Sequence, residues 1–222
     1  MILTHREWNF NIEIEGLNTI IIENPKLYRR ILMDIDNQLS GLEGGFTLIN
    51  ELKEVKISSE LYLVRSPFLI SINDKKIINK LYAELKGDVI SSEFDRFQEL
   101  ERSILSFVNE IIFNNSIGLE VDCSIEIEDI FKLTGVKFCE DTGKDIIERL
   151  LEHALIVQDY LMPSAIVYLN TRSLFSDIEW CDFTKELSVR NINAIFIERY
   201  GGAVSKLIEK RYTIDEDLCE IY

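Results

Sequence analysis

The sequence predicts an α/β protein, with a head built around a mainly parallel sheet and an α-helical insertion. Three observations favour this class: three short, nearly continuous apolar runs, a helical pattern directly after the first of them, and a long central region with helical periodicity. Continuous apolar runs are typical of strands buried on both faces, and the order strand, helix, strand favours a right-handed βαβ unit. We therefore expect the head at residues 1–73 and 161–222 and the insertion at residues 74–160.

The first part of the head is predicted to contain two strands and a helix. Residues 8–14 alternate between polar and apolar side chains, which is typical of a half-exposed strand. Residues 19–22 form the first apolar run. Asn24 then provides a helix cap and Pro25 the first helical position, and apolar side chains recur every four residues as far as Leu39.

The second part of the head repeats the pattern of strand and helix. The other two apolar runs are residues 165–169 and 194–197, and a helix is expected between them from about residue 173 to residue 190. Residues 46–64 and 206–221 contain further strand-like pieces, which we expect to pair antiparallel at the margins of the sheet.

The insertion is predicted to be helical because its apolar side chains recur at intervals of three and four residues. The clearest stripe is formed by Phe97, Leu100, Ile104, Phe107 and Ile111. Such a stripe suits the packing of helix on helix. Packing inside the insertion is the favoured interpretation, and docking of a partner protein is the alternative. Residues 147–155 form a companion stripe, in which His153 is expected on the helix surface.

The composition is that of an ordinary globular protein with an acidic balance. The 222 residues include 39 Asp and Glu and 24 Lys and Arg, which gives a net charge of −15. Such a chain repels nucleic acid and anionic membranes on average, although its charge can be segregated onto different faces. No apolar run reaches the roughly 18 residues of a membrane span, and the N-terminus has no signal-peptide pattern, so we expect a cytoplasmic protein.

The motifs of several enzyme and metal-binding classes are missing from the sequence. The chain contains no GxxxxGK[ST] phosphate loop, no GxGxxG dinucleotide motif and no GxSxG nucleophile elbow. Its four cysteines form no CxxC pair, so neither a zinc site nor a disulfide framework is predicted, and the thiols are expected to be reduced and packed. We therefore expect no enzymatic activity, and an NTPase with an unusual phosphate loop stays open as an alternative.

The first cluster that could carry function is basic. Lys26, Arg29 and Arg30 lie in the first turns of the helix that follows the first apolar run. Acidic residues are the ordinary choice there, because the helix dipole is positive at that end. Three cations beside free backbone N–H groups would make a phosphate contact. The alternative, which the residues alone favour, is a solvated helix face on which Arg30 pairs with Asp34.

The second cluster is acidic. It comprises Glu120, Asp122, Glu126, Glu128 and Asp129. Hard cations such as calcium need several oxygen ligands. However, the spacing is not that of an EF-hand loop, and a hydrated surface is the alternative interpretation. Two lysines, Lys132 and Lys137, flank the turn that comes next.

Five segments, in their order and spacing, resemble a known family, the ring-forming adaptation proteins of type II-A CRISPR–Cas systems. The segments are residues 20–30 (IIIENPKLYRR), 59–64 (SELYLV), 119–122 (LEVD), 130–137 (IFKLTGVK) and 192–198 (INAIFIE). The likeness runs over essentially the whole chain, and it rests on the ordered set rather than on one diagnostic motif.

The resemblance implies a P-loop-NTPase-like head without a Walker motif and a helical leg, assembled into a homotetrameric ring. It implies that the ring holds double-stranded DNA, preferably at free ends, in its central hole, and acts without known catalysis in spacer acquisition. By position, Arg30, Lys132 and Lys137 match the basic residues of the ring's inner surface, and Lys26 and Arg29 are additional DNA-binding candidates.

The resemblance also implies calcium and protein partners. Glu120, Asp122 and Asp129 match the acidic region that binds calcium near the hinge between head and leg, whereas Cys123 and Ser124 stand where further acids would be expected. The implied partners are the integrase pair and the effector nuclease of the acquisition complex. The alternative function is a protein-interaction scaffold of that complex with no direct contact to DNA.

Overall fold

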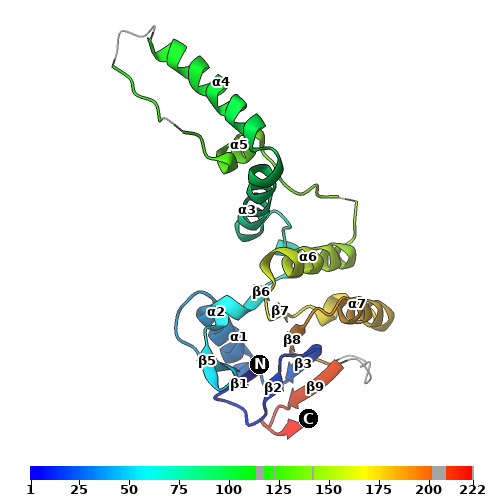
Figure 1. The fold of residues 1–222 in the computed structure, drawn as a ribbon. Helices are drawn as coiled ribbons and strands as arrows, with labels where there is room; N and C mark the ends of the chain where they lie inside the picture. Colours follow the sequence, from blue (N-terminus) through cyan, green and yellow to red (C-terminus); the bar gives the residue numbers. More distant parts are fainter. Residues whose placement is uncertain (114–117, 123, 142, 202–208, 222) are drawn as a thin grey trace. The chain divides into compact units, whose positions relative to one another are not determined.

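The chain forms two compact units in the computed structural model, which describes residues 1–113, 118–122, 124–141, 143–201 and 209–221. Unit 1 comprises Met1–Ile72 and Asp141–Tyr222, and unit 2 comprises Asn73–Glu140. Unit 1 contains sheets and helices, whereas the regular elements of unit 2 are helices (Figure 1), so the predicted α/β class is confirmed. Cys123 and residues 206–208 of the expected C-terminal strand region lie outside the described residues.

The main sheet of unit 1 is formed, in the described residues, by six strands in the order β10-β9-β3-β8-β7-β6. These strands are β3 (Leu17–Ile22), β6 (Leu61–Val64), β7 (Ala165–Leu169), β8 (Ala194–Glu198), β9 (Glu209–Ile214) and β10 (Glu220–Ile221). All neighbours pair parallel except β9 and β10. The three predicted apolar runs lie in β3, β7 and β8, which are buried along their whole length. The prediction of a mainly parallel sheet is therefore confirmed.

Helices cover both faces of this sheet. The helices of unit 1 are α1 (Pro25–Leu39), α2 (Ile57–Glu60), α6 (Ile146–Leu161) and α7 (Asp177–Val189), with the 3-10 turns η1 (Pro67–Leu69) and η2 (Arg172–Leu174). On one face, Ile31 of α1 belongs to the same buried cluster as Val167 of β7. On the other face, the ring of Phe183 in α7 meets that of Tyr168, the next residue of β7, with 6.1 Å between centroids. Successive residues of β7 thus face opposite sides of the sheet, because side chains alternate along a pleated strand.

A second sheet is antiparallel and packs on the α1 side. It consists of β2 (Ile12–Glu13), β1 (Ile2–His5), β4 (Phe46–Asn50) and β5 (Lys53–Val55), in that order. Residues 46–64 were expected at the margin of one sheet, but they divide between two: β4 pairs with β1, and β6 pairs parallel with β7. β9 likewise pairs parallel with β3. The predicted strand at residues 8–14 shortens to β2, and Trp8 and Phe10, which precede it, stack on each other in the core.

The structural division of the chain ends the insertion at Glu140, not at residue 160. α6 belongs to unit 1, where it packs against α7 and buries Leu150 and Val157. Helical periodicity shows that a helix has an apolar face, but it does not show which part of the protein that face covers.

Two side-chain expectations are wrong. His153 is buried in α6, and its Nε2 lies 3.3 Å from the hydroxyl of Tyr62 in β6. Three of the thiols that were expected to be packed are exposed, namely Cys139, Cys181 and Cys219. In both cases the local sequence predicted the wrong degree of burial. The burial of a side chain depends on neighbours that are distant in the chain, which the local sequence does not show.

Unit 2 is built from α3 (Lys75–Ser92), α4 (Phe94–Phe113) and α5 (Ile127–Thr134). α3 packs against both other helices, and the hydroxyl of Tyr82 donates to the carbonyl of Val136 at 2.9 Å. No residue of α4 is buried within the described chain. Among the helices of the described ranges, none is both long enough and apolar enough to cross a membrane.

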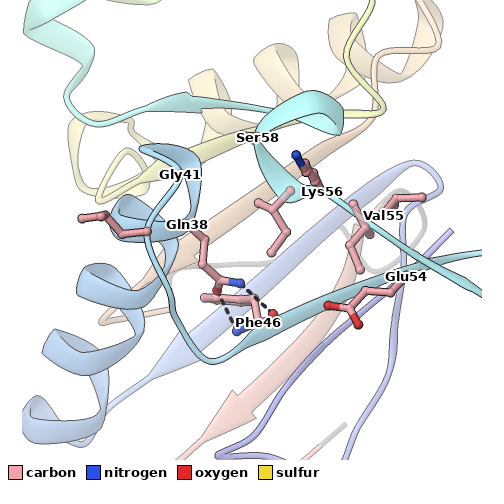
Figure 2. A pocket seen from close by; sticks show the side chains of 10 residues that line it. Gln38, Gly41, Phe46, Glu54, Val55, Lys56 and Ser58 are labelled. Atoms are coloured by element: carbon pink, nitrogen blue, oxygen red, sulfur yellow. Dashed lines mark hydrogen bonds between the residues drawn. The ribbon is translucent and has the colours of Figure 1, made fainter.

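A hollow of about 530 Å³ lies between the end of α1, the strands β4 and β5, and α2 (Figure 2). The side-chain amide of Gln38 donates to the carbonyl of Phe46 and accepts from its N–H, both at 2.8 Å. Gln38 therefore acts as a strand partner for the start of β4 and holds the small sheet against α1. The predicted site residues are not among those that line this hollow.

Candidate nucleic-acid interface

The basic cluster at the start of α1 is exposed. Lys26, Arg29 and Arg30 face solvent, whereas Leu27 and Tyr28 between them are buried in unit 1. The first turn of α1 contains no acidic residue. The positive end of the helix dipole and three cations therefore add their effects on one surface, which favours an anion.

Arg30 has an ion pair, but not the expected one. Its Nη1 lies 2.5 Å from Oε1 of Glu7, in the turn after β1, so the predicted pairing with Asp34 is wrong. Within the described ranges, Lys26 and Arg29 have no ion pair. Two of the three cations are therefore available to a phosphate without breaking an internal contact.

Asp34 belongs instead to a buried network that positions Glu7. Its Oδ2 lies 3.0 Å from Nε2 of His5 and 3.4 Å from Nη2 of Arg6. The backbone N–H of Glu7 donates to Nδ1 of His5 at 3.2 Å, so the proton of a neutral ring lies on Nε2, facing Asp34. Burial lowers the pKa of His5, although the hydrogen bond to Asp34 opposes this shift. The network fixes the turn after β1 against α1.

The two other predicted DNA-binding residues lie in unit 2. Nζ of Lys132, in the last turn of α5, is 2.8 Å from Oδ1 of Asp129. Lys137 is exposed and has no ion pair with a described residue. The five candidates thus fall into two groups, one in each unit.

The segment around Lys137 is fastened to α3 on both sides. The carbonyl of Val136 accepts the hydrogen bond from Tyr82, and the N–H of Phe138 donates to Oδ1 of Asn73 at 2.9 Å. Because Asn73 lies just before α3, Lys137 lies beside the first turns of this helix.

α3 adds three exposed lysines that the sequence analysis did not select as DNA-binding candidates. Lys75, Lys76 and Lys80 have no ion pair in the described part of the chain, and Lys76 and Lys80 are one turn apart on one helix face. The missed signal is the same as in α1: cations in a first helical turn, where the dipole disfavours them. The basic surface of unit 2 is therefore larger than Lys132 and Lys137 alone.

The predicted calcium ligands do not meet. Glu120 and Asp122 are exposed in an irregular segment, and Asp129 is bonded to Lys132. Across the described residues, no three His, Cys, Asp or Glu side chains come together in a way that could hold a metal ion. By themselves, these residues therefore do not fit a calcium site.

The other two acids of this stretch both pair with one lysine. Nζ of Lys86 in α3 is 3.1 Å from Oε2 of Glu126 and 2.9 Å from Oε1 of Glu128. The hydrogen bond to Glu128 raises the pKa of Lys86, and the same bond lowers the pKa of Glu128. These two ion pairs hold Glu126 and Glu128, at the start of α5, against α3.

A buried carboxyl group lies at the end of β8 in unit 1. Glu198 is 3% exposed, and its Oε1 accepts the backbone N–H groups of Thr171 at 2.7 Å and Arg172 at 3.0 Å. Burial raises the pKa of Glu198 to about 7, although these two donors oppose the shift. Neither the motifs nor the composition pointed to this residue.

Glu198 is expected to make the protein less stable as the pH rises from about 4.5 to about 7. In this range the carboxyl group ionises in the unfolded chain and stays protonated in the folded chain. Rising pH therefore stabilises the unfolded state relative to the folded state. The loss is on the order of 3 kcal/mol. Denaturant unfolding at pH 5 and pH 8 measures it. Glu198→Gln keeps the acceptor oxygen and should remove most of the difference; an unchanged pH dependence in this variant would contradict the assignment.

Comparison with known proteins identifies one family. The family model of the CRISPR-associated protein (Cas_Csn2) matches residues 38–218. No curated protein matches the chain. Among solved structures, a similar chain is a bacterial Atm1-family ABC exporter with ATP bound, 9% identical, with a TM-score of 0.41. The match covers 93% of this chain and 33% of the exporter chain, so this chain spans about a third of the exporter's length. A likeness this low supports no conclusion about fold or function.

The family match extends over most of the chain and over both units. It includes the main-sheet strands from β6 to β9 and the lysines Lys132 and Lys137, and it begins after the basic cluster of α1. The resemblance of the ordered sequence segments and the match to the family model point to the same family. The chain therefore belongs to the Cas_Csn2 family of CRISPR-associated proteins.

Proposed function

We propose that four copies of the chain form a ring that binds double-stranded DNA, preferably at its ends, in the central hole during spacer acquisition by a type II-A CRISPR–Cas system. The family implies the role in acquisition; the ring and the DNA contact are the proposal. The ring would act in the cytoplasm, and its partner proteins would be the integrase pair and the effector nuclease. The observation that supports DNA binding best is the exposed cluster of Lys26, Arg29 and Arg30 at the positive end of α1.

The proposal includes a head that acts without catalysis. A parallel sheet followed by a helix at its first buried strand is the arrangement of a P-loop NTPase. Here the β3–α1 connection carries Glu23 and Asn24 in place of a glycine-rich loop, and GxxxxGK[ST] is missing from the whole sequence. We interpret the head as a P-loop-NTPase-like fold that has lost its phosphate loop.

Ring symmetry reconciles an acidic chain with DNA binding. A net charge of −15 repels a duplex on average. About three cations per subunit, repeated in four copies, would present roughly twelve positive charges to the duplex in one hole. Contacts of this kind neutralise phosphates and do not read bases, so little sequence preference is expected.

Competition between linear and circular duplexes tests the proposal. The protein should bind a linear duplex more tightly than a covalently closed circle of the same sequence, and the affinity should fall steeply with salt. Equal binding to both forms, or a weak salt dependence, would contradict the model of a ring threaded by DNA ends.

The apolar stripe of α4 supports assembly. Phe107 is 64% exposed and Ile111 is 55% exposed in the described chain, so packing inside the insertion does not account for this part of the stripe. Nearer the start of α4, Phe97 and Leu100 line a hollow of about 420 Å³ shared with α3 and α5. Contiguous exposed apolar surface is typical of a protein interface.

Phe107→Ser combined with Ile111→Ser is expected to reduce the particle from four copies of 25.8 kDa to smaller species that keep the secondary structure of the parent. Light scattering measures the particle mass, and far-ultraviolet circular dichroism measures the secondary structure. Ile178→Ser, at an exposed position of α7, is the control and should leave the mass unchanged. A double variant that keeps the mass of the parent would exclude the stripe from the ring interface.

The same exposed stripe favours a second candidate function, a scaffold that docks a protein of the acquisition complex and does not contact DNA. Charge reversal at Arg30, Lys132 and Lys137 separates the two functions. A scaffold would keep its activity in spacer acquisition, whereas a DNA-binding ring would lose it.

Calcium stays a prediction with its own test. Because the described acids do not form a site by themselves, calcium would have to bring Glu120, Asp122 and Asp129 together or use the neighbouring subunit. If calcium supports the ring, a chelator should lower both the particle mass and the melting temperature, and added calcium should restore them. No change in either quantity would remove calcium from the proposal.

A further inference from the structure

A pocket of about 320 Å³ lies at the carboxyl ends of β7 and β8, outside the basic clusters described above. Its lining includes Asn170, Arg172, Asp177, Glu198, Arg199 and Gly201. In open α/β sheets, ligands bind in the crevice beyond the carboxyl ends of the parallel strands. The pocket borders α1, because the hydroxyl of Tyr28 donates to Oδ1 of Asn170 at 2.5 Å.

Arg172 is a buried arginine with one unused donor. Its side chain is 10% exposed, its guanidinium lies 5.2 Å from the ring centre of Trp180, and its two Nη atoms bond to the carbonyl of Phe175 and to Asp177. Its Nε is also buried, yet no described residue accepts a hydrogen bond from it. A charged donor left without a partner inside a protein is costly, so a ligand that accepts from it would be favoured.

Arg199, which also lines the pocket, has the same feature. Its guanidinium lies 5.2 Å from the ring centre of Tyr200, and its buried Nε finds no acceptor in the described part of the chain. A third guanidinium, that of Arg211 in β9, comes so close to Gly201 that a side chain at this position would collide with it. Three arginines from three segments therefore converge on this edge of the sheet.

The charge of the pocket depends on Glu198. The lining carries two arginines, Arg172 and Arg199, and two acids, Asp177 and Glu198, so its charges balance only while Glu198 is ionised. The other titratable groups near Glu198 are Tyr28 of α1 and Glu209 of β9.

We propose that this pocket binds a phosphate group, either of a small phosphate ester or of inorganic phosphate or of a DNA terminus, through the Nε–H donors of Arg172 and Arg199. Arginine donors in fixed positions are the groups that recognise phosphate oxygens best. Protonation of Glu198 removes the nearest negative charge, and the pKa of about 7 places this change in the neutral range. Binding is therefore tighter at pH 6 than at pH 8. The site is independent of a DNA-binding ring, because it needs only unit 1.

Calorimetric titration of the full chain with sulfate tests the site, because sulfate stays doubly charged between pH 6 and pH 8. We expect saturable binding that is about tenfold tighter at pH 6, and a loss of about tenfold at pH 6 in Arg199→Gln. Glu198→Gln should bind as tightly at pH 8 as at pH 6, which separates Glu198 from the histidines. The control Arg190→Gln, at an exposed position after α7, should bind like the parent.

Two further arms identify the source of the phosphate. Preference for a short duplex with a 5′-phosphate over the same duplex with a 5′-hydroxyl, abolished in Arg199→Gln, would assign a DNA terminus. Sulfate and inorganic phosphate binding without such a preference would assign a small phosphate compound. The proposal is overturned if neither sulfate nor phosphate binds, or if Arg199→Gln binds them like the parent.

Discussion

Reversing the charges of Lys26 and Arg29 is expected to lower the affinity for linear duplex DNA about 100-fold at constant salt. Both side chains are exposed at the positive end of α1 and have no ion pair in the described chain. In Lys26→Glu/Arg29→Glu, each subunit loses two attractive charges and gains two repulsive ones, and a ring multiplies the change by its symmetry. Fluorescence anisotropy over a salt series measures the effect, and the slope of log affinity against log salt should become shallower by about 0.9 for each phosphate that the variant no longer neutralises.

The matched control reverses Lys185 and Arg190, which are exposed in and just after α7, on the other face of the sheet. Lys185→Glu/Arg190→Glu changes the net charge by the same amount and should change the affinity less than about threefold. Acidic residues suit the first turn of a helix, so the α1 variant is expected to fold. Equal losses in both double variants would mean that net charge, and not the surface of α1, governs the affinity.

Trp180→Ala is expected to lower the free energy of unfolding by about 3–5 kcal/mol. Trp180 is 1% exposed, and its ring centre lies 4.6 Å from that of Phe196 in β8. Its Nε1 donates to Oε2 of Glu209 at 3.2 Å. Truncation leaves a cavity between α7 and the sheet, and it removes a donor from a buried carboxylate. Urea unfolding monitored by far-ultraviolet circular dichroism measures the loss.

Two other variants define this effect. Ile178→Ala lies in the same helix at an exposed position and should change the stability by less than about 0.5 kcal/mol. Trp180→Phe keeps much of the volume and should lose less than the alanine variant. A loss below about 1 kcal/mol in Trp180→Ala would contradict the tight packing of α7 on the sheet.

The parallel sheet was predictable because its strands are buried on both faces. Such strands are continuous apolar runs, and β3, β7 and β8 stand out in the sequence for this reason. The start of α1 was also predictable, since Asn24 accepts hydrogen bonds from the N–H groups of Lys26 and Leu27 as a cap does.

The edges of the sheet were harder to predict. The strands β4, β6 and β9 are only partly buried, so their sequences carry no signal for a particular partner. Partner choice depends on residues far apart in the chain: β6 pairs with β7, more than a hundred positions later, and β9 pairs with β3. α6 raised the same difficulty, since its apolar face was visible and the surface that it covers was not.

The candidate sites divide in the same way. The cations of α1 were found because a basic first turn departs from the ordinary pattern. The lysines of α3 carry the same signal and were missed, because lysine is common on any exposed helix face. No rule of sequence could have found the pocket at Glu198, since its two arginines come from η2 and from the residue after β8.

The sequence by itself determined the class of the protein, the buried strands, the cap of α1 and the exposure of its cations, because each depends on residues within a few positions of one another. Only the tertiary structure decided that Arg30 pairs with Glu7, that His153 is buried, and that Arg172 and Arg199 line one pocket with Glu198. The physical reason is range: helix periodicity, caps and apolar runs are local, whereas ion pairs, burial and pockets arise where distant segments meet.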